Sequence, residues 1–231
     1  MRNKEKTAMP IQKREDVHRV AEYLYEKYKQ GEMLRIMFLI GCNTGLRAGE
    51  LRGLRIGDLL NGDSFTVVES KTKNTRQVFI NSALKQAVEK YIKEPSIKIK
   101  IDGRKKTEII KINLQDESDF ILTGGQGAVI GIQYMHRVIS GACRNLGIRG
   151  SYGSLSMAKT FAYHVFQRTG NINIVKSILA HSDRELTKNY IHDGRSLRMA
   201  KKDFGNGVFK IENSADPEVS VIKYCYEINL A

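Results

Sequence analysis

The sequence predicts a mostly helical α+β domain with a small antiparallel sheet. Apolar residues recur at the spacing of an amphipathic helix over most of the chain, whereas alternating apolar and polar residues are confined to a few short segments next to turn-forming residues. At 231 residues and 41% hydrophobic content, the chain is long enough to bury a globular core. One compact domain is therefore the expected organisation.

The charge balance indicates a polyanionic partner. Lysine and arginine together number 38 against 25 aspartate and glutamate residues, which gives a net charge of +13 and a pI of about 9.6. Nucleic acid is the obvious partner of this kind. A basic but otherwise ordinary soluble protein is the alternative, because the charges are spread along the chain and form no tail.

Composition also argues against several classes of protein. No segment approaches the roughly 18 uninterrupted apolar residues of a membrane span, and residues 1–16 lack the apolar core of a signal peptide. We therefore expect an intracellular protein with no membrane partner. Cys42, Cys143 and Cys225 are too far apart in sequence to suggest a disulfide framework or a zinc cluster.

Three helices are expected in the first part of the chain. The first opens with the acidic pair Glu15 and Asp16, which suits a helix N-terminus. The second covers residues 33–40, is apolar enough to be central, and stops at residues 43–45. The third follows at once in the stretch LRAGELRGL, with Arg47 near its start.

Two hairpins contain most of the expected strands, and the final segment VSVIKYCYEINL alternates well enough to be another. Residues 65–69 and 76–80 alternate and are joined by the basic tip SKTKNT, which contains Lys71 and Lys73. Further helices are expected after the first hairpin and before the last third of the chain. The second hairpin surrounds the turn-forming pair Asp102 and Gly103.

The stretch from residue 153 to residue 190 combines helix signals with a histidine and a tyrosine. A short apolar helix runs into the sequence AHSD, and a polar helix start then leads to Thr187 and Tyr190. His181 and Tyr190 are therefore expected on neighbouring elements. Taken singly, each of these two residues is more often structural than functional.

Two separated blocks carry a resemblance to a known family. NTGLRAGELRGLRIGDL occupies residues 43–59, and LSMAKTFA, AHS and Tyr190 follow later in that order. This order resembles the catalytic domain of the tyrosine recombinases, the phage integrase family, whose blocks read TGLRxxEL and HxLRHTFA followed by GH and a tyrosine. Leu155 stands where that family usually has histidine or lysine, and Ala158 stands where it has its second arginine.

The resemblance implies a catalytic-domain fold of the tyrosine recombinase type and a set of roles. Tyr190 would be the nucleophile, Arg47 would bind the attacked phosphate, and His181 would donate a hydrogen bond to it. Lys71, with Lys73 as the second choice, would protonate the leaving hydroxyl. This chemistry requires no metal or nucleotide cofactor.

The two departures predict impaired cleavage. Loss of one preorganised charged donor typically costs on the order of a hundredfold to a thousandfold in rate, and both Leu155 and Ala158 are apolar. Lys159 is adjacent to Ala158, but consecutive helix residues point about 100° apart, so it is not a direct substitute.

These observations predict a duplex DNA-binding protein derived from a recombinase, acting as a regulator, repressor or accessory factor of a phage or mobile element, in the nucleoid. One alternative is an active site-specific recombinase in which Ala158 is engineered or compensated. The other is a protein interaction module that has lost DNA binding. The residues expected to contact DNA are Arg47, Lys71, Lys73, Arg76 and Lys159.

The expected domain organisation has three parts. Residues 1–12 form a flexible N-terminus, and residues 13–192 form the integrase-like domain, with residues 95–113 as an inserted hairpin. Residues 193–231 form a C-terminal tail. In relatives of the family such tails often dock on a neighbouring protomer, so a homo-oligomer is one expectation and packing on its own domain is the other. A separate protein partner is also expected, since the chain lacks the N-terminal half of the DNA clamp that the family commonly carries.

Overall fold

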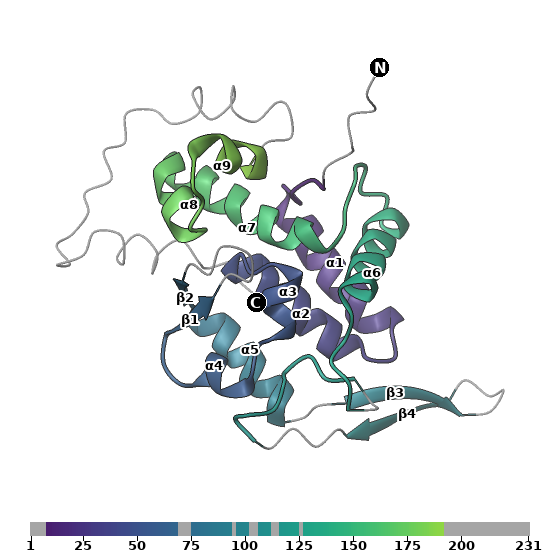
Figure 1. Ribbon diagram of the computed structural model, residues 1–231. Helices are drawn as coiled ribbons and strands as arrows, with labels where there is room; N and C mark the ends of the chain where they lie inside the picture. The colour runs from purple at the N-terminus through teal and green to yellow at the C-terminus, as the bar shows by residue number, and fades with distance from the viewer. Residues whose placement is uncertain are drawn as a thin grey trace.

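The computed structural model describes residues 8–68, 75–93, 96–101, 106–111, 116–124 and 127–191. Helices make up most of this part of the chain, together with two separate antiparallel hairpins, so the predicted fold class is confirmed (Figure 1). The elements are, in chain order, α1 (Arg14–Lys27), α2 (Gly31–Thr44), α3 (Ala48–Arg52), α4 (Ile56–Leu60), β1 (Ser64–Val68), β2 (Thr75–Phe79), α5 (Ser82–Lys93), β3 (Ser96–Ile101), β4 (Lys106–Lys111), α6 (Ile132–Asn145), α7 (Ser154–Thr169), α8 (Ile172–Ile178) and α9 (Arg184–Ile191).

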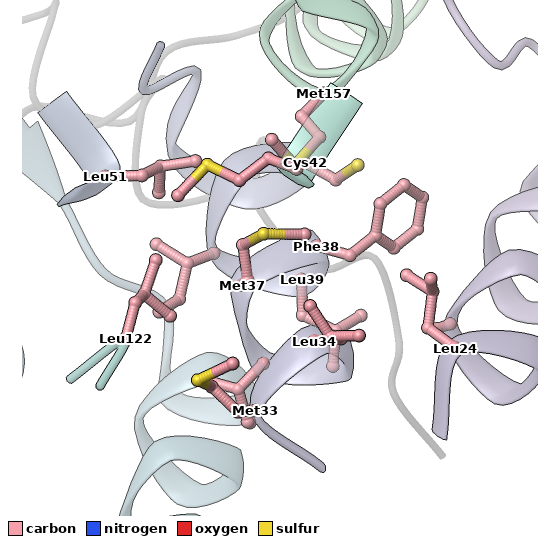
Figure 2. Packing of buried hydrophobic residues seen from close by; sticks show 14 of the residues in the cluster. Leu24, Met33, Leu34, Met37, Phe38, Leu39, Cys42, Leu51, Leu122 and Met157 are labelled. Carbon is pink, nitrogen blue, oxygen red and sulfur yellow. The ribbon is translucent and has the colours of Figure 1, made fainter. Parts of the chain in front are cut away.

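Helix α2 forms the centre of the fold, as its apolar sequence predicts. Nearly every residue in it is buried, because apolar side chains surround most of its circumference. Helices α1, α5 and α7 pack against it. Figure 2 shows Met33, Met37 and Phe38 of α2 among the side chains that meet there, with Leu24 from α1 and Met157 from α7.

Two glycines shape the path of α2. A Cβ atom on Gly41 would lie 2.8 Å from the side chain of Met157, so the glycine allows α7 to approach closely. Gly45 ends the helix with a φ of 68°, a left-handed conformation that favours glycine. A Cβ atom there would lie 2.5 Å from Phe161. The chain therefore turns tightly at Gly45, immediately before Arg47.

Both predicted hairpins are confirmed. In the first, Phe65 lies opposite Val78. In the second, Ile97 lies opposite Ile110, and β3 and β4 extend away from the helices in Figure 1. The two hairpin tips, residues 69–74 and 102–105, lie outside the described residues.

The chain before α1 is attached to α7. The backbone N–H of Ile11 donates to Thr160 Oγ1 at 2.9 Å, and the backbone oxygen of Ile11 lies 3.1 Å from His164 Nε2. Ile11 is fully buried. The expectation of a flexible segment over residues 1–12 therefore does not describe Ile11, because its backbone groups are bonded and its side chain is packed. Residues 1–7 lie outside the described residues.

Helices α7, α8 and α9 enclose a second apolar cluster beside the main core (Figure 1). The buried face of α9 consists of Thr187, Tyr190 and Ile191. The short α9 thus turns Tyr190 towards the interior of the domain.

The described helices are all too short or too polar to cross a bilayer. The predicted C-terminal tail, residues 193–231, lies outside the described residues, and its role in assembly stays a prediction.

Candidate functional site

The start of α3 fixes the position of Arg47. The backbone N–H of Arg47 donates to Glu50 Oε2 at 2.7 Å, and its carbonyl oxygen accepts the N–H of Leu51 at 2.9 Å. A glutamate at the third helical position that accepts the N-cap N–H is one half of a capping box. Arg47 Nε in turn donates to the hydroxyl oxygen of Tyr190 at 3.0 Å.

The turn after α8 fixes the position of His181. The N–H of Ala180 donates to Ser177 O and the N–H of His181 donates to Lys176 O, both at 3.0 Å, which is the pattern of a Schellman motif. Ala180 has a φ of 49°, and the left-handed conformation costs a residue with a Cβ about 1–2 kcal/mol. The integrase motif quoted above has glycine at this position.

A hydrogen bond orients the His181 ring. Its Nδ1 lies 3.1 Å from Thr187 Oγ1, and the Thr187 hydroxyl donates to Asp183 O. A hydroxyl has one hydrogen, so Nδ1 of His181 is the donor in the first contact. The ring is held edge-on to Tyr190, with centroids 4.6 Å apart and an interplanar angle of 70°.

Tyr190 lies near the end of α9 and is only 7% exposed. Two cations lie near its ring: the guanidinium carbon of Arg47 is 5.9 Å from the centroid, and Nζ of Lys159 is 5.6 Å from it. Both distances are within the range of cation–π attraction. Tyr190 therefore contacts basic groups from the start of α3, from α7 and from the turn after α8.

Lys159 is buried, with 4% of its surface exposed. Its Nζ donates to the backbone oxygen of Asn189 at 3.0 Å, which ties α7 to α9. Burial lowers the pKa of the Lys159 ammonium, because the charged form is poorly solvated there. Lys159 therefore contacts both the ring of Tyr190 and the backbone of α9.

Arg76 reaches the same region from β2. Its Nη2 lies 3.0 Å from Glu50 Oε2 and 3.4 Å from Gly45 O, and its side chain is 8% exposed. Glu50 therefore holds the backbone of Arg47 and the side chain of Arg76 with the same carboxylate oxygen.

These groups surround one small pocket. Its volume is about 10 Å³, room for roughly one water molecule. The residues that line it are Gly45, Arg47, Glu50, Arg76, Leu179, Ala180, His181 and Tyr190.

The two positions that depart from the integrase motif lie in apolar surroundings. Ala158 is fully buried in the cluster that also contains Phe161, Leu179 and Tyr190. Leu155 is half-buried and packs against the same cluster. Apolar contacts therefore occupy the space next to Tyr190 where the motif supplies polar side chains.

The structure brings most of the predicted site residues together. Arg47, His181 and Tyr190 share the pocket, Arg76 lines it, and Lys159 lies beside Tyr190. Arg76 and Lys159 were expected to contact DNA, and the side chains of both are largely buried, at 8% and 4% exposure. The catalytic and DNA-binding roles of all five stay predictions.

Three further residues complete the comparison with the sequence. Lys71 and Lys73 lie outside the described residues. Glu50 was not singled out from the sequence, although it is the glutamate of the TGLRxxEL block. Its spacing of three residues from an expected helix start was the signal that could have identified its capping role.

Comparison with known proteins identifies the family. The sequence model described as "Phage integrase family" matches residues 13–196. The chain belongs to the phage integrase family. It is 30% identical over 197 residues to the probable integrase/recombinase YoeC of Bacillus subtilis (strain 168), an alignment that covers 85% of this chain and 96% of YoeC.

The chain spans about half the length of several other curated relatives that it matches. The chain is 27% identical over 150 residues to tyrosine recombinase XerC of Thermodesulfovibrio yellowstonii, which covers 65% of this chain and 46% of XerC. Among solved structures, the Tn1549 transposon integrase in complex with a circular intermediate DNA has a TM-score of 0.58 and 16% identity, covering 87% of this chain and 67% of that one. This likeness shows the integrase fold.

Proposed function

We propose that this member of the phage integrase family binds duplex DNA through the basic site around Tyr190, cleaves it very slowly or not at all, and acts as a regulator, repressor or accessory factor of a phage or mobile element. One observation carries the proposal. Arg47 is held 3.0 Å from the Tyr190 hydroxyl, while Ala158, at the place of the second arginine, is sealed in an apolar cluster with Tyr190.

Charge and family relationship support DNA as the partner. The net charge of +13 favours a polyanion, and arginine guanidinium groups suit phosphate through paired, charge-assisted hydrogen bonds. A member of the same fold, the Tn1549 integrase, has been solved with DNA. Contacts to phosphate position a protein on DNA but do not select a sequence, so the target sequence depends on other side chains.

The apolar positions support a loss of cleavage. The attack of a tyrosine on a phosphodiester places negative charge on the nonbridging phosphate oxygens, and preorganised cationic donors stabilise that charge. Ala158 and Leu155 supply no donor and are packed against apolar neighbours. Arg47 is the remaining arginine of the quoted family motif.

An active site-specific recombinase is the second candidate. The observation in its favour is that Arg47, His181 and Tyr190 are still gathered in one pocket. In such a reaction the Tyr190 hydroxyl would lose its proton and its oxygen would form a bond to phosphorus, while the bond from phosphorus to the leaving oxygen of the DNA breaks. That oxygen would take up a proton from a general acid and leave as a hydroxyl, and the phosphotyrosyl bond would keep the energy for rejoining.

DNA binding is tested by selection of a preferred duplex from a random-site library, followed by measurement of Kd between about 50 and 200 mM KCl. Phosphate contacts make the logarithm of affinity fall with the logarithm of salt by about 0.9 for each neutralised phosphate. The affinity of the full chain should fall steeply with salt, and Arg47→Gln should lower the slope by about 0.9, the value for one phosphate contact.

Arg35→Gln is the matched control for that variant. Arg35 is also partly buried and paired with a carboxylate, that of Glu32, but it does not line the pocket. Its substitution should leave the slope unchanged. Binding that is undetectable or insensitive to salt would contradict the proposal and favour a protein interaction module.

A further inference from the structure

We propose that Arg76 is the second phosphate ligand of the site around Tyr190, in place of the arginine that the integrase motif has at Ala158. Arg76 is on β2, far from Ala158 in sequence, and it lines the same pocket as Arg47, His181 and Tyr190. Arg76 can play this part only if the chain binds DNA as proposed above.

The burial of Arg76 sets it apart from an ordinary surface arginine. Its side chain is 8% exposed, and arginine is almost never fully buried unless it is paired. Part of the pairing is visible. Nη2 donates to Glu50 Oε2 at 3.0 Å and to Gly45 O at 3.4 Å.

The other terminal nitrogen of Arg76, Nη1, lacks a hydrogen-bond acceptor among the described residues. Within the part of the chain that the structure describes, Nη1 is buried and has no hydrogen-bond partner. A buried donor on a charged group without an acceptor is unfavourable, and a water, an ion or a ligand commonly satisfies such a group in native proteins. Nε of Arg35 is also buried without an acceptor among the described residues, but Arg35 does not line the pocket. A phosphate oxygen entering the pocket would supply the missing acceptor.

Glu50 fixes Arg76 next to Arg47. The same Oε2 atom accepts the backbone N–H of Arg47 at 2.7 Å and Nη2 of Arg76 at 3.0 Å. The two arginines are therefore fixed to one carboxylate at the edge of one pocket. A guanidinium is planar and rigid, so fixing Nη2 also fixes the direction of Nη1.

The charge of the site also favours an anion. Arg47, Arg76 and Lys159 are near Tyr190, and Glu50 is the carboxylate among the residues that line the pocket. Lys159 already donates to Asn189 O. Arg76, in contrast, has a buried N–H donor at Nη1 that a ligand can use.

The pocket must open for this contact to form. At about 10 Å³ it holds roughly one water molecule, and a phosphate group is several times larger. The Tyr190 hydroxyl at present accepts the hydrogen bond of Arg47. Outward movement of the Tyr190 side chain would expose Arg47 Nε and give a phosphate access to Arg76.

The test is a charge-neutral pair variant of the full chain, Glu50→Gln with Arg76→Gln. It removes one positive and one negative charge, so the net charge of the protein is unchanged. The two amide side chains can still form a hydrogen bond to each other. Binding to the selected duplex is measured across KCl concentrations. We expect the salt slope to fall by about 0.9, the value for one phosphate contact. The same exchange at Glu32 and Arg35, outside the pocket, is the control and should leave the slope unchanged.

The outcomes separate this assignment from the proposed function. Wild-type binding with a steep slope that Arg47→Gln lowers, but that the pair variant does not, would overturn the role of Arg76 and leave DNA binding intact. Absence of salt-dependent binding by the wild type would overturn both. If thermal unfolding shows that the pair variant does not fold, Arg76→Lys replaces it, because lysine can keep the ion pair with Glu50 but lacks the second nitrogen. Several-fold weaker binding is then expected, and unchanged binding would overturn the role of Arg76.

Discussion

The Nε atom of Arg47 donates a hydrogen bond to the hydroxyl of Tyr190 at 3.0 Å, although the two residues are 143 positions apart in the chain. The bond joins the start of α3 to α9. The integrase resemblance assigns the arginine to the phosphate and the tyrosine to the attack on it. The bond occupies Arg47 Nε, so a phosphate that uses this nitrogen would have to displace the tyrosine hydroxyl.

This relationship predicts the effect of Tyr190→Phe on DNA binding. The variant keeps the aromatic ring near Arg47 and Lys159. It removes the hydroxyl that accepts the hydrogen bond from Arg47 Nε and would compete there with a phosphate oxygen. A hydrogen bond of this kind contributes about 1 kcal/mol, so Kd for the selected duplex should decrease about fivefold. Tyr163→Phe, on α7 and outside the pocket, is the control. Unchanged or weaker binding by Tyr190→Phe would show that the hydroxyl does not compete with DNA.

The backbone at Ala180 predicts a stabilising substitution. Ala180 has a φ of 49° in the turn that positions His181. Ala180→Gly removes the left-handed strain, which is partly offset by the greater freedom of glycine in the unfolded chain, and should raise the free energy of unfolding by about 0.5–1 kcal/mol. Urea unfolding measures it. Ala87→Gly, within helix α5, should have the opposite sign and cost about 1 kcal/mol. A loss of stability in Ala180→Gly would contradict the assigned strain.

The backbone at Gly45 predicts a destabilising substitution. Its φ of 68° disfavours any side chain, and a Cβ atom would lie 2.5 Å from Phe161 and 2.9 Å from Leu179. Gly45→Ala should therefore lower the free energy of unfolding by about 2–3 kcal/mol through left-handed strain and overpacking. Gly49→Ala is the matched control, because a Cβ atom on Gly49 would have no neighbouring atom within 4 Å among the described residues. Equal stability of the two variants would show that the turn at Gly45 tolerates a side chain.

His164 predicts a pH dependence of stability. Burial lowers the pKa of His164 from 6.5 to about 4. The unfolded chain therefore binds a proton near pH 6.5 before the folded chain does, and folded stability falls as the pH decreases from about 6.5 to 4. The loss is at most about 3 kcal/mol, because the side chain is only half-buried.

His164→Gln tests this prediction. Glutamine can still donate to the backbone oxygen of Ile11, as His164 does at 3.1 Å, but it does not titrate. The difference between the unfolding free energies at pH 7 and pH 4.5 should be smaller in the variant than in the wild type. Parallel pH profiles would mean that His164 titrates normally in the folded protein.

The sequence predicted the elements with strong periodicity and missed those set by tertiary contacts. The central position of α2 followed from its apolar residues, and both hairpins followed from alternation. Helix α4, Ile56–Leu60, was not predicted. Contacts with a distant segment hold it in place, such as the N–H of Ile56 donating to Asp119 O at 3.0 Å and the N–H of Gly57 donating to Glu117 O at 2.9 Å.

In the site, too, the sequence predicted the residues that belong to a motif and missed the contacts between distant elements. The TGLRxxEL and AHS blocks predicted that Arg47, His181 and Tyr190 belong together, and the structure places all three at one pocket. The sequence did not predict the ion pair of Glu50 with Arg76, which joins residues 26 positions apart on different elements. Nor did it predict that Nζ of Lys159 lies 5.6 Å from the centre of the Tyr190 ring.

The most direct test of a DNA-binding site that does not cleave is a covalent-adduct assay. The wild-type chain is incubated with the selected duplex carrying a nick near the preferred site, so that any cleaved strand diffuses away and the phosphotyrosyl product accumulates. A denaturing gel then separates free DNA from protein-linked DNA. We predict tight binding under native conditions and no adduct on the denaturing gel. An adduct that forms with the wild type and disappears in Tyr190→Phe would contradict the account and establish an active recombinase despite Leu155 and Ala158.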